Sequence, residues 1–268
     1  MSKLVERNNL MDLKLSNRCV FVSGSHRGTG LIIAQYLAQA GARVLVHGLE
    51  PGQAQAAIED VPGGIPVTGD IRTDDGARAV AVMCEHEQVD ILINNYGATE
   101  AGSWVSSTSA DWLASYQRNV LSAQRMIQLF LPGMIKGGWG RIINLGTVGS
   151  TRPNDRNPQY YAAKGALATM TISLAREVSG TGVRVNLVSP GMILTPEVEA
   201  AYVARGKRKG WGDTWQEIEA KVAEDIPIGR IVRREEVAWL VAFLASPLAD
   251  AVHGQNIRID GGALGILT

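Results

Sequence analysis

The chain has 268 residues, of which 46% are hydrophobic and 19% charged, and its formal net charge is zero. This composition fits one large α/β domain with a sizeable core, and the lack of net positive charge argues against a nucleic-acid or membrane partner. Two cysteines, Cys19 and Cys84, cannot form a disulfide framework, and the four histidines show no metal-ligand spacing, so we expect no bound metal.

The N-terminal stretch Met1–Leu15 mixes charged and apolar residues and lacks the apolar core of a signal peptide. No apolar run in the sequence is long enough to span a bilayer. We therefore expect a cytoplasmic protein.

Strand-like apolar runs alternate with helix-like segments along the whole chain. The predicted strands are Cys19–Val22, Arg43–His47, Ile65–Thr68, Val89–Asn94, Arg141–Leu145, Val183–Val188 and Asn256–Ile259. The predicted helices are Thr29–Ala40, Asp74–Glu87, a long helix from an N-cap at Ser109 to about Lys136, Ala162–Ser179 and Glu235–Ala245. This alternation predicts a doubly wound parallel sheet with helices on both faces, a three-layer Rossmann fold, in a single domain over 1–268.

The first predicted strand leads into a glycine-rich turn with glycines at 24, 28 and 30. Gly24 permits a tight turn, while Gly28 and Gly30 would let a diphosphate approach the backbone at a helix N-terminus. Plain turn chemistry is the alternative. The position between the first strand and the first helix favours dinucleotide binding.

The end of the second predicted strand should select the cofactor. An acidic residue there would indicate NAD, but the chain has His47, Gly48 and Leu49, with Glu50 too late. Arg27 in the glycine-rich turn is positioned to meet a 2′-phosphate, although a solvated loop arginine is the alternative. We expect NADP(H), with NAD(H) possible.

Residues 195–225 interrupt the alternation and contain Tyr202, Trp211, Trp215 and the basic run Arg205–Lys209. Such a segment predicts a variable substrate lid within the domain. The aromatic residues either close over an apolar substrate or attach the lid to its own protein. The basic run either attracts an anionic substrate or forms a solvated face.

Tyr160 and Lys164 lie four residues apart, next to the predicted helix Ala162–Ser179. Helical spacing places them one turn apart on one face. The ammonium would favour phenolate and lower the pKa of Tyr160 toward a range useful for proton transfer. Taken alone, the pair could equally be a tyrosine beside a surface lysine.

From about Lys14 to Gly262 the chain resembles the short-chain dehydrogenase/reductase family in its compact form. The residues that carry the resemblance occur in order: Gly24, Gly28 and Gly30; Asp70; Asn94-Asn95-Tyr96-Gly97; Asn119; Thr147; Tyr160 and Lys164; Pro190-Gly191 with Thr195; and Ile259-Asp260-Gly261-Gly262. The resemblance implies an NAD(P)-dependent oxidoreductase that transfers a hydride between a nicotinamide and a carbonyl or secondary alcohol.

The resemblance also implies roles for individual residues. Tyr160 would be the general acid/base, Lys164 would hold the nicotinamide ribose and lower the Tyr160 pKa, Thr147 would bind the carbonyl oxygen, and Asn119 would hold a proton-relay water. The implied cofactor-binding set is Gly24, Ser25, Arg27, Gly28, Thr29, Gly30, Asp70, Ile71, Asn94, Asn95, Gly97, Tyr160, Lys164, Pro190, Gly191 and Thr195. Among these, Asp70 would meet the adenine, Asn94 and Gly97 the adenosine ribose, and Pro190, Gly191 and Thr195 the nicotinamide.

Two residues depart from the family pattern. Thr147 replaces the usual serine, which keeps the hydroxyl but adds a methyl group and restricts χ1. Tyr96 replaces a small residue, so its ring either crowds the adenosine side or fills a structural gap. The two departures leave open a catalytically weakened NADP-binding regulatory protein of the same fold.

The sequence also gives expectations for the substrate and the oligomeric state. We expect the pocket walls to come from Val148–Gln159, Trp104, Met192 and residues 195–225. A 3-oxoacyl-carrier-protein reductase is an alternative, but the basic residues with which such enzymes dock their carrier align with Gly138 and Thr181. A small-molecule ketone, alcohol or sugar is preferred, in a homotetramer that pairs the long helices and C-terminal strands, with a dimer as the fallback.

Overall fold

Seven parallel strands form the central sheet, in the order β3-β2-β1-β4-β5-β6-β9. The computed structural model describes residues 12–266, so most of the predicted signal-free stretch Met1–Leu15 lies outside them. The strands are β1 Cys19–Val22, β2 Arg43–Gly48, β3 Ile65–Thr68, β4 Ile91–Asn94, β5 Gly140–Leu145, β6 Val183–Pro190 and β9 Asn256–Ile259. The predicted doubly wound α/β fold is confirmed.

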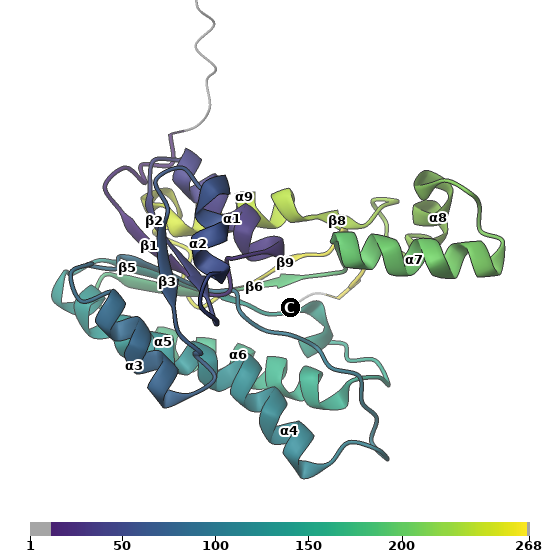
Figure 1. Ribbon diagram of the computed structural model, residues 1–268, viewed down its shortest axis with the longest axis horizontal. Coiled ribbons are helices and arrows are strands. Elements are labelled where there is room, and N and C mark those ends of the chain that lie inside the picture. The colour runs from purple at the N-terminus through teal and green to yellow at the C-terminus, as the bar shows by residue number, and fades with distance from the viewer. Residues whose placement is uncertain (1–11, 267–268) are drawn as a thin grey trace, which may run out of the picture.

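Helices cover both faces of the sheet (Figure 1). They are α1 Gly28–Gln39, α2 Gln53–Ala57, α3 Asp74–Met83, α4 Ser109–Tyr116, α5 Ser122–Lys136, α6 Pro158–Glu177, α7 Pro196–Lys209, α8 Trp215–Val222 and α9 Arg234–Ala245. Side chains of α1, α2 and α9 form the core on one face, and those of α3, α5 and α6 form the core on the other. Because both faces are covered, β1, β4 and β5 are buried along their whole length.

The long helix predicted from Ser109 to Lys136 is divided. A π-helical turn at Gln117–Leu121 separates α4 from α5. The N-cap is Thr108 rather than Ser109, because Thr108 is followed three residues later by Asp111, and the two form a reciprocal capping box. The π-helical turn carries Asn119, whose side chain is buried.

Two other helix boundaries differ from the prediction. The helix carrying Lys164 begins at Pro158, because proline is well tolerated in the first turn, and Tyr160 is therefore helical itself. The helix predicted over Asp74–Glu87 ends at Met83. The short helix α2 was not predicted.

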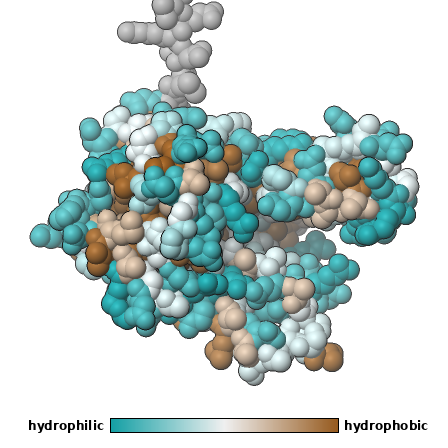
Figure 2. Space-filling view, viewed as in Figure 1, coloured by the Kyte–Doolittle hydropathy of each residue, from teal (hydrophilic) through white to brown (hydrophobic). Residues whose placement is uncertain are grey.

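Residues 195–225 form the helical arm that carries α7 and α8, which stands out from the body with a recess beneath it (Figure 1, Figure 2). The arm is connected to the body by the small parallel pair β7 Ile193–Leu194 and β8 Val232–Arg233. Glu219 of α8 accepts hydrogen bonds from the backbone N–H of Ile231, at 3.1 Å, and from Arg233 Nη2, at 2.9 Å.

None of the helices within residues 12–266 combines the length and the apolar character needed to cross a bilayer. The same residues contain no group of three or more His, Cys, Asp or Glu side chains arranged to hold a metal ion.

Candidate active site

The glycine-rich turn between β1 and α1 is fixed from two sides. The buried His47 ring accepts a hydrogen bond from the Gly24 N–H at Nδ1, at 3.0 Å, and its Nε2 lies 2.9 Å from the Gly69 carbonyl oxygen. Asn95 Nδ2 donates to the Ser23 carbonyl at 3.0 Å. A Cβ on residue 30 would overlap this Asn95 nitrogen, so only glycine fits there.

The turn delivers free N–H groups to a cavity. Arg27 is the N-cap of α1 and makes no side-chain hydrogen bond to the helix, so the first-turn N–H groups have no capping partner. These N–H groups and the positive end of the helix dipole are the features that bind a diphosphate.

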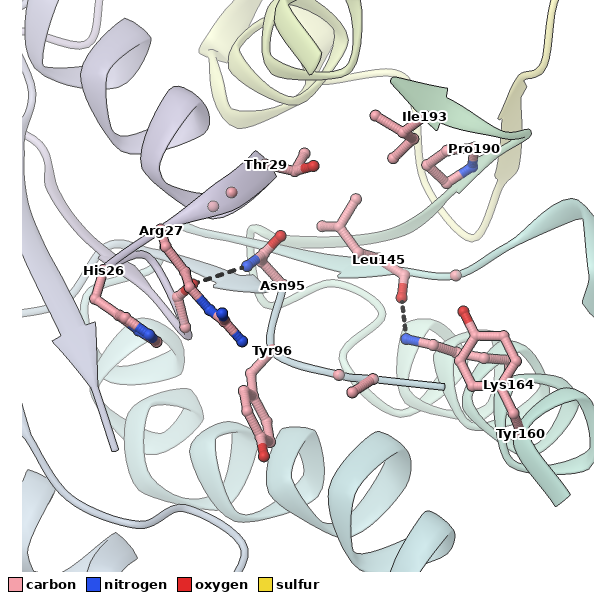
Figure 3. Close-up of a pocket in the computed structure, with 16 residues that line it drawn as sticks. His26, Arg27, Thr29, Asn95, Tyr96, Leu145, Tyr160, Lys164, Pro190 and Ile193 are labelled. Carbon is pink, nitrogen blue, oxygen red and sulfur yellow. Dashed lines mark hydrogen bonds between the residues drawn. The ribbon is translucent and has the colours of Figure 1, made fainter. Parts of the chain in front are cut away.

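One cavity joins this turn to the Tyr160/Lys164 pair (Figure 3). Its lining comprises Gly24, His26, Arg27, Gly28, Thr29, Gly30, Asn95, Tyr96, Gly97, Ala98, Leu145, Gly146, Tyr160, Lys164, Pro190 and Ile193. The carboxyl ends of β1, β4, β5 and β6 all contribute to it, which is where ligands bind in open α/β sheets.

Tyr160 directs its hydroxyl into the cavity beside Lys164 (Figure 3). The Lys164 ammonium is buried, lies 6.0 Å from the centre of the Tyr160 ring, and donates to the Leu145 carbonyl oxygen at 2.7 Å. Burial, with a smaller contribution from Tyr161, raises the pKa of Tyr160 to about 12. Burial also lowers the pKa of Lys164 to about 8.

The prediction that Lys164 lowers the pKa of Tyr160 is therefore wrong for this structure. Desolvation of the phenolate outweighs the attraction of an ammonium that is turned toward a carbonyl. The spacing of the two residues predicted their proximity correctly, but it carried no information on the water that the fold excludes around them.

Asn119, like Lys164, lies beside Gly97. Its Oδ1 accepts from the Ala98 N–H at 3.1 Å, and its Nδ2 donates to the carbonyls of Ala98 and Ser115, each at 3.0 Å. A Cβ on residue 97 would lie 2.7 Å from this Oδ1 and 3.1 Å from Lys164 Nζ. Glycine at 97 thus leaves open the space between Asn119 and Lys164.

Thr147 follows β5 and caps the 3₁₀ turn Val148–Ser150. Its Oγ1 accepts from the Gly149 N–H at 3.2 Å, so the hydroxyl proton remains free to be donated to another oxygen. Thr147 itself is not among the residues that line the cavity.

Two charged or titratable side chains mark the opposite end of the cavity. Arg27 points into it (Figure 3), and within residues 12–266 its guanidinium forms no ion pair. His26, which the sequence reasoning missed, also lines the cavity, and its buried Nδ1 has no hydrogen-bond partner in that range. Its position between Gly24 and Gly28 in the glycine-rich turn could have identified it as a residue of the site.

The side chains of several predicted cofactor-binding residues make contacts within the fold. Ser25 is buried, donates to the Val22 carbonyl at 2.7 Å, and accepts from the His47 N–H. Ile71 is a core residue, so only its main chain is left for a ligand. The Asp70 carboxylate accepts hydrogen bonds from the Arg72 guanidinium, at 2.8 and 2.9 Å, and from the Arg72 backbone N–H, at 3.1 Å, and these bonds lower its pKa.

Asn94 is predicted beside the adenosine ribose, but its side chain does not line the cavity. Its side chain is buried and donates to Asn144 Oδ1 at 2.8 Å, because the last residue of β4 points toward α6. The next residue, Asn95, faces the cavity. Alternation along the strand explains why one of two adjacent asparagines meets the cavity and the other does not.

On the side predicted to hold the nicotinamide, Pro190 and Ile193 line the cavity. Gly191 packs against Asp260, since a Cβ there would lie 3.0 Å from the Asp260 Cα. Thr195 is the N-cap of α7 and accepts from the Val198 N–H at 3.2 Å.

Tyr96 has a dual position. It lines the cavity and also packs against the core, and its Cβ stands 3.2 Å from where a Cβ on Gly24 would be. Burial raises the pKa of its phenol. In the predicted lid, the Trp211 ring has the cations of Arg205 and Lys209 at 5.3 and 5.4 Å from its centre, so its contacts are with the lid segment itself.

These residues fit a dinucleotide. The glycine cradle accepts no side chain at 30, the first-turn donors of α1 are uncapped, and His26 presents an unpartnered ring nitrogen. Each feature supplies space or donors for an anionic ligand.

Comparison with known proteins agrees with this arrangement. A family model described as enoyl-(acyl carrier protein) reductase matches residues 24–263. The 3-oxoacyl-[acyl-carrier-protein] reductase FabG of Vibrio cholerae is 34% identical over 253 residues, which cover 93% of this chain and 98% of that protein.

Solved structures are similar over almost the same extent. The structure of L-sorbose reductase from Gluconobacter frateurii, complexed with NADPH and L-sorbose, has a TM-score of 0.89 and 29% identity, and the match covers 96% of this chain and 100% of the other. A 3-oxoacyl (acyl-carrier-protein) reductase from Agrobacterium tumefaciens C58 with NADP bound has a TM-score of 0.83 and 29% identity, with coverage of 96% and 99%.

Proposed function

The chain belongs to the short-chain dehydrogenase/reductase family, and we propose that this NAD(P)-dependent oxidoreductase uses NADPH to reduce a small ketone or keto sugar. Membership confirms the family resemblance and the oxidoreductase activity that it implied. The observation that carries the proposal is a single cavity with Arg27 at one end and Tyr160 with Lys164 at the other.

Tyr160 acts as the general acid in this proposal. Bound NADPH supplies a hydride to the carbonyl carbon. The Tyr160 hydroxyl donates its proton to the carbonyl oxygen, so the product is an alcohol and the phenolate is left to be reprotonated. With a pKa of about 12 the phenol is protonated at neutral pH, which is the form that donates in the reductive direction.

Three neighbours complete the catalytic set. Thr147 donates its free hydroxyl proton to the same carbonyl oxygen. Lys164 binds the nicotinamide ribose and passes a proton to Tyr160, and Asn119 holds the water that serves Lys164. The gap beside Gly97, which separates Asn119 from Lys164, is the space for that water.

The choice of NADPH rests on charge. The acceptor that would bind a 2′-hydroxyl is absent at the end of β2, where His47 is turned inward to Gly24 and Gly69. Arg27 and His26 supply donors for a 2′-phosphate instead. The L-sorbose reductase structure with NADPH and the Agrobacterium structure with NADP support the same choice.

The remaining cofactor contacts follow the cavity. Gly28, Thr29 and Gly30 hold the diphosphate through their N–H groups, Asn95 and Gly97 flank the adenosine ribose, and Pro190 packs on the nicotinamide. Asp70 remains the proposed contact for the adenine. Thr195, the N-cap of α7 at the start of the arm, remains a proposed contact for the nicotinamide.

Consumption of NADPH, followed by its absorbance over a panel of ketones and keto sugars, tests the proposal. We expect turnover of at least one substrate, loss of turnover in Tyr160→Phe with NADPH binding retained, and a preference for NADPH over NADH that is lost in Arg27→Ala. Tight NADPH binding without turnover of any carbonyl would favour the regulatory alternative.

A 3-oxoacyl-carrier-protein reductase is the second candidate, and the Vibrio relative favours it. The residues at the two aligned docking positions oppose it, because Gly138 has no side chain and Thr181 turns its hydroxyl to the Val178 carbonyl at 2.6 Å. A 3-oxoacyl thioester presented free and on its carrier distinguishes the two. A carrier reductase should prefer the carrier-linked form.

We also propose a cytoplasmic homotetramer, with a dimer as the alternative. The apolar residues that line a groove between α5 and α6 support pairing of the long helices. They are Ile127, Leu131, Pro132, Met170 and Leu174, and Gln124, Gln128, Ser173 and Glu177 complete the lining. Light scattering at micromolar concentration measures the assembly.

A further inference from the structure

We propose that Tyr161 is a positioning residue that fixes the Thr147 hydroxyl and the adjoining substrate loop. The inference rests on the proposed function, because it assigns Thr147 to the substrate oxygen. Tyr161 follows Tyr160 directly in α6, and the mechanism above leaves it without a role.

The Tyr161 ring lies flush against the backbone of Gly149. A Cβ on residue 149 would overlap Cε1 and Cδ1 of the ring, and Gly149 is buried. The conformation of Gly149 is not left-handed, so the backbone does not itself demand glycine there. The ring of Tyr161 is the reason that residue 149 has no side chain.

Gly149 in turn holds Thr147. Its N–H donates to Thr147 Oγ1 at 3.2 Å, which occupies one acceptor site of the hydroxyl and aims the proton elsewhere. Ser150 reinforces the turn, since its Oγ donates to the Thr147 carbonyl at 2.7 Å. The ring of Tyr161 therefore sets where the Thr147 hydroxyl proton points.

Tyr161 also contacts both sides of the site. Its ring lies edge-on to Tyr160, with centroids 5.3 Å apart and an interplanar angle of 64°. Its hydroxyl accepts from Asn154 Nδ2 at 2.9 Å, and Asn154 Oδ1 accepts from the Arg156 N–H at 2.8 Å. One side chain thus connects the proton donor, the turn of Thr147 and the exposed loop 151–157.

Four variants test the two contacts separately. Tyr161→Ala removes the ring, Tyr161→Phe keeps the ring and removes the bond to Asn154, and Gly149→Ala introduces the overlap. The double variant Gly149→Ala/Tyr161→Ala introduces the side chain but removes the ring that it meets. Tyr36→Phe, on α1 against Trp239, is the matched tyrosine control.

We expect Tyr161→Ala to lower kcat about tenfold or more, since a displacement of about 1 Å at a catalytic group has effects up to about a hundredfold. NADPH affinity should change by less than about twofold. Tyr161→Phe should rescue kcat but raise the carbonyl KM, and Tyr36→Phe should match the wild type. An unchanged kcat in Tyr161→Ala would overturn the positioning role.

The double variant provides the sharper comparison. Gly149→Ala should lower both Tm and kcat, and removal of the Tyr161 ring should restore part of the Tm, because the overlap is gone. If the double variant is less stable than Gly149→Ala alone, the contact between residues 149 and 161 is not the constraint we infer.

The two proposals fail in different ways. Wild-type protein that reduces no carbonyl refutes the proposed function, whereas the Tm comparison needs no substrate and still tests the contact. Wild-type turnover together with an unaffected Tyr161→Ala refutes only the role of Tyr161.

Discussion

Lys164 would be charged in water but lies in a region from which the fold excludes water. Its side chain is almost completely buried, and burial lowers its pKa from 10.5 to about 8. The folded pKa is below the unfolded one, so the unfolded state binds more protons between pH 8 and 10.5. Burial of the ammonium therefore destabilises the fold below pH 8, by about 3 kcal/mol, and this cost disappears as the pH rises to 10.5.

We predict that Lys164→Met stabilises the protein and abolishes turnover. Removal of the buried charge should gain more than is lost with the hydrogen bond to the Leu145 carbonyl, for a net gain of about 1–2 kcal/mol at pH 7. Thermal unfolding of cofactor-free protein at pH 7 and 10.5 measures this. The gain should vanish at the higher pH, and a variant that is less stable than the wild type at pH 7 contradicts the prediction.

Burial suits His47, whereas it is a cost for Lys164, because the structure uses the neutral form of the imidazole. Nδ1 can accept from the Gly24 N–H only while it is unprotonated, and burial lowers the pKa to about 4. His26 and Asp70 are the nearest titratable groups that act on it, in opposite directions. The sequence showed His47 only as a missing acid at the ribose position, since its inward orientation depends on how β1, β2 and β3 meet.

We predict that the wild type loses stability from pH 6.5 to 4 and that His47→Asn loses less. The unfolded imidazole binds its proton near 6.5 and the folded one near 4, so stability falls by up to about 3 kcal/mol across this window. Asn keeps an acceptor for Gly24 but does not titrate. Carboxylates such as Glu236, whose pKa Arg230 holds near 2, contribute equally to both proteins, so parallel acid unfolding curves would disprove the assignment.

At the scale of elements, the glycine-rich turn is specified by what surrounds it. A Cβ on Gly30 would overlap Asn95 Nδ2 and lie 2.7 Å from the Gly24 carbonyl oxygen. In contrast, a Cβ on Gly133 in α5 would meet nothing within 4 Å. The two glycines look alike in the sequence but occupy opposite environments.

We predict opposite effects for alanine at these two glycines. Gly30→Ala should lower stability and weaken NADPH binding at least about tenfold, because the turn must open to admit the methyl group. Gly133→Ala should stabilise α5 by about 0.5–1 kcal/mol and leave NADPH binding unchanged. Thermal unfolding and fluorescence titration with NADPH measure both, and tight binding by Gly30→Ala would refute the packing argument.

Local signals predicted most elements because β1 and β4 are short, mostly apolar runs, β9 alternates polar and apolar residues, and the helices have clear ends. The π-helical turn at Asn119 could not be predicted, since α4 and α5 share one helical pattern and the break depends on contacts with Ala98 and Ser115. Thr108 could have been identified as the cap from Asp111 three residues later.

At the scale of the whole molecule, both faces of the sheet are covered, yet apolar side chains remain outside on the long helices. Ile135 of α5 is 42% exposed and Ile172 of α6 is 38% exposed, on the two helices whose groove is lined by Ile127 and Met170. Isolated exposed apolar residues are ordinary on a monomer, but exposed apolar residues on two neighbouring helices are consistent with a surface for association. A second copy of the same helices would cover them symmetrically.

We predict that Ile172→Arg dissociates the assembly. Two copies of the charge would be brought together and desolvated across a symmetric helix pairing, so the mass measured by light scattering should fall by a factor of about two. Val82→Arg on α3, where the apolar residue is 67% exposed but does not line the groove, is the matched control and should keep the wild-type mass. Because the sheet and its two cores belong to one subunit, Ile172→Arg should stay folded, and its far-UV circular dichroism should match the control. A wild-type mass for Ile172→Arg would show that the face of α6 that carries Ile172 is not where the copies meet.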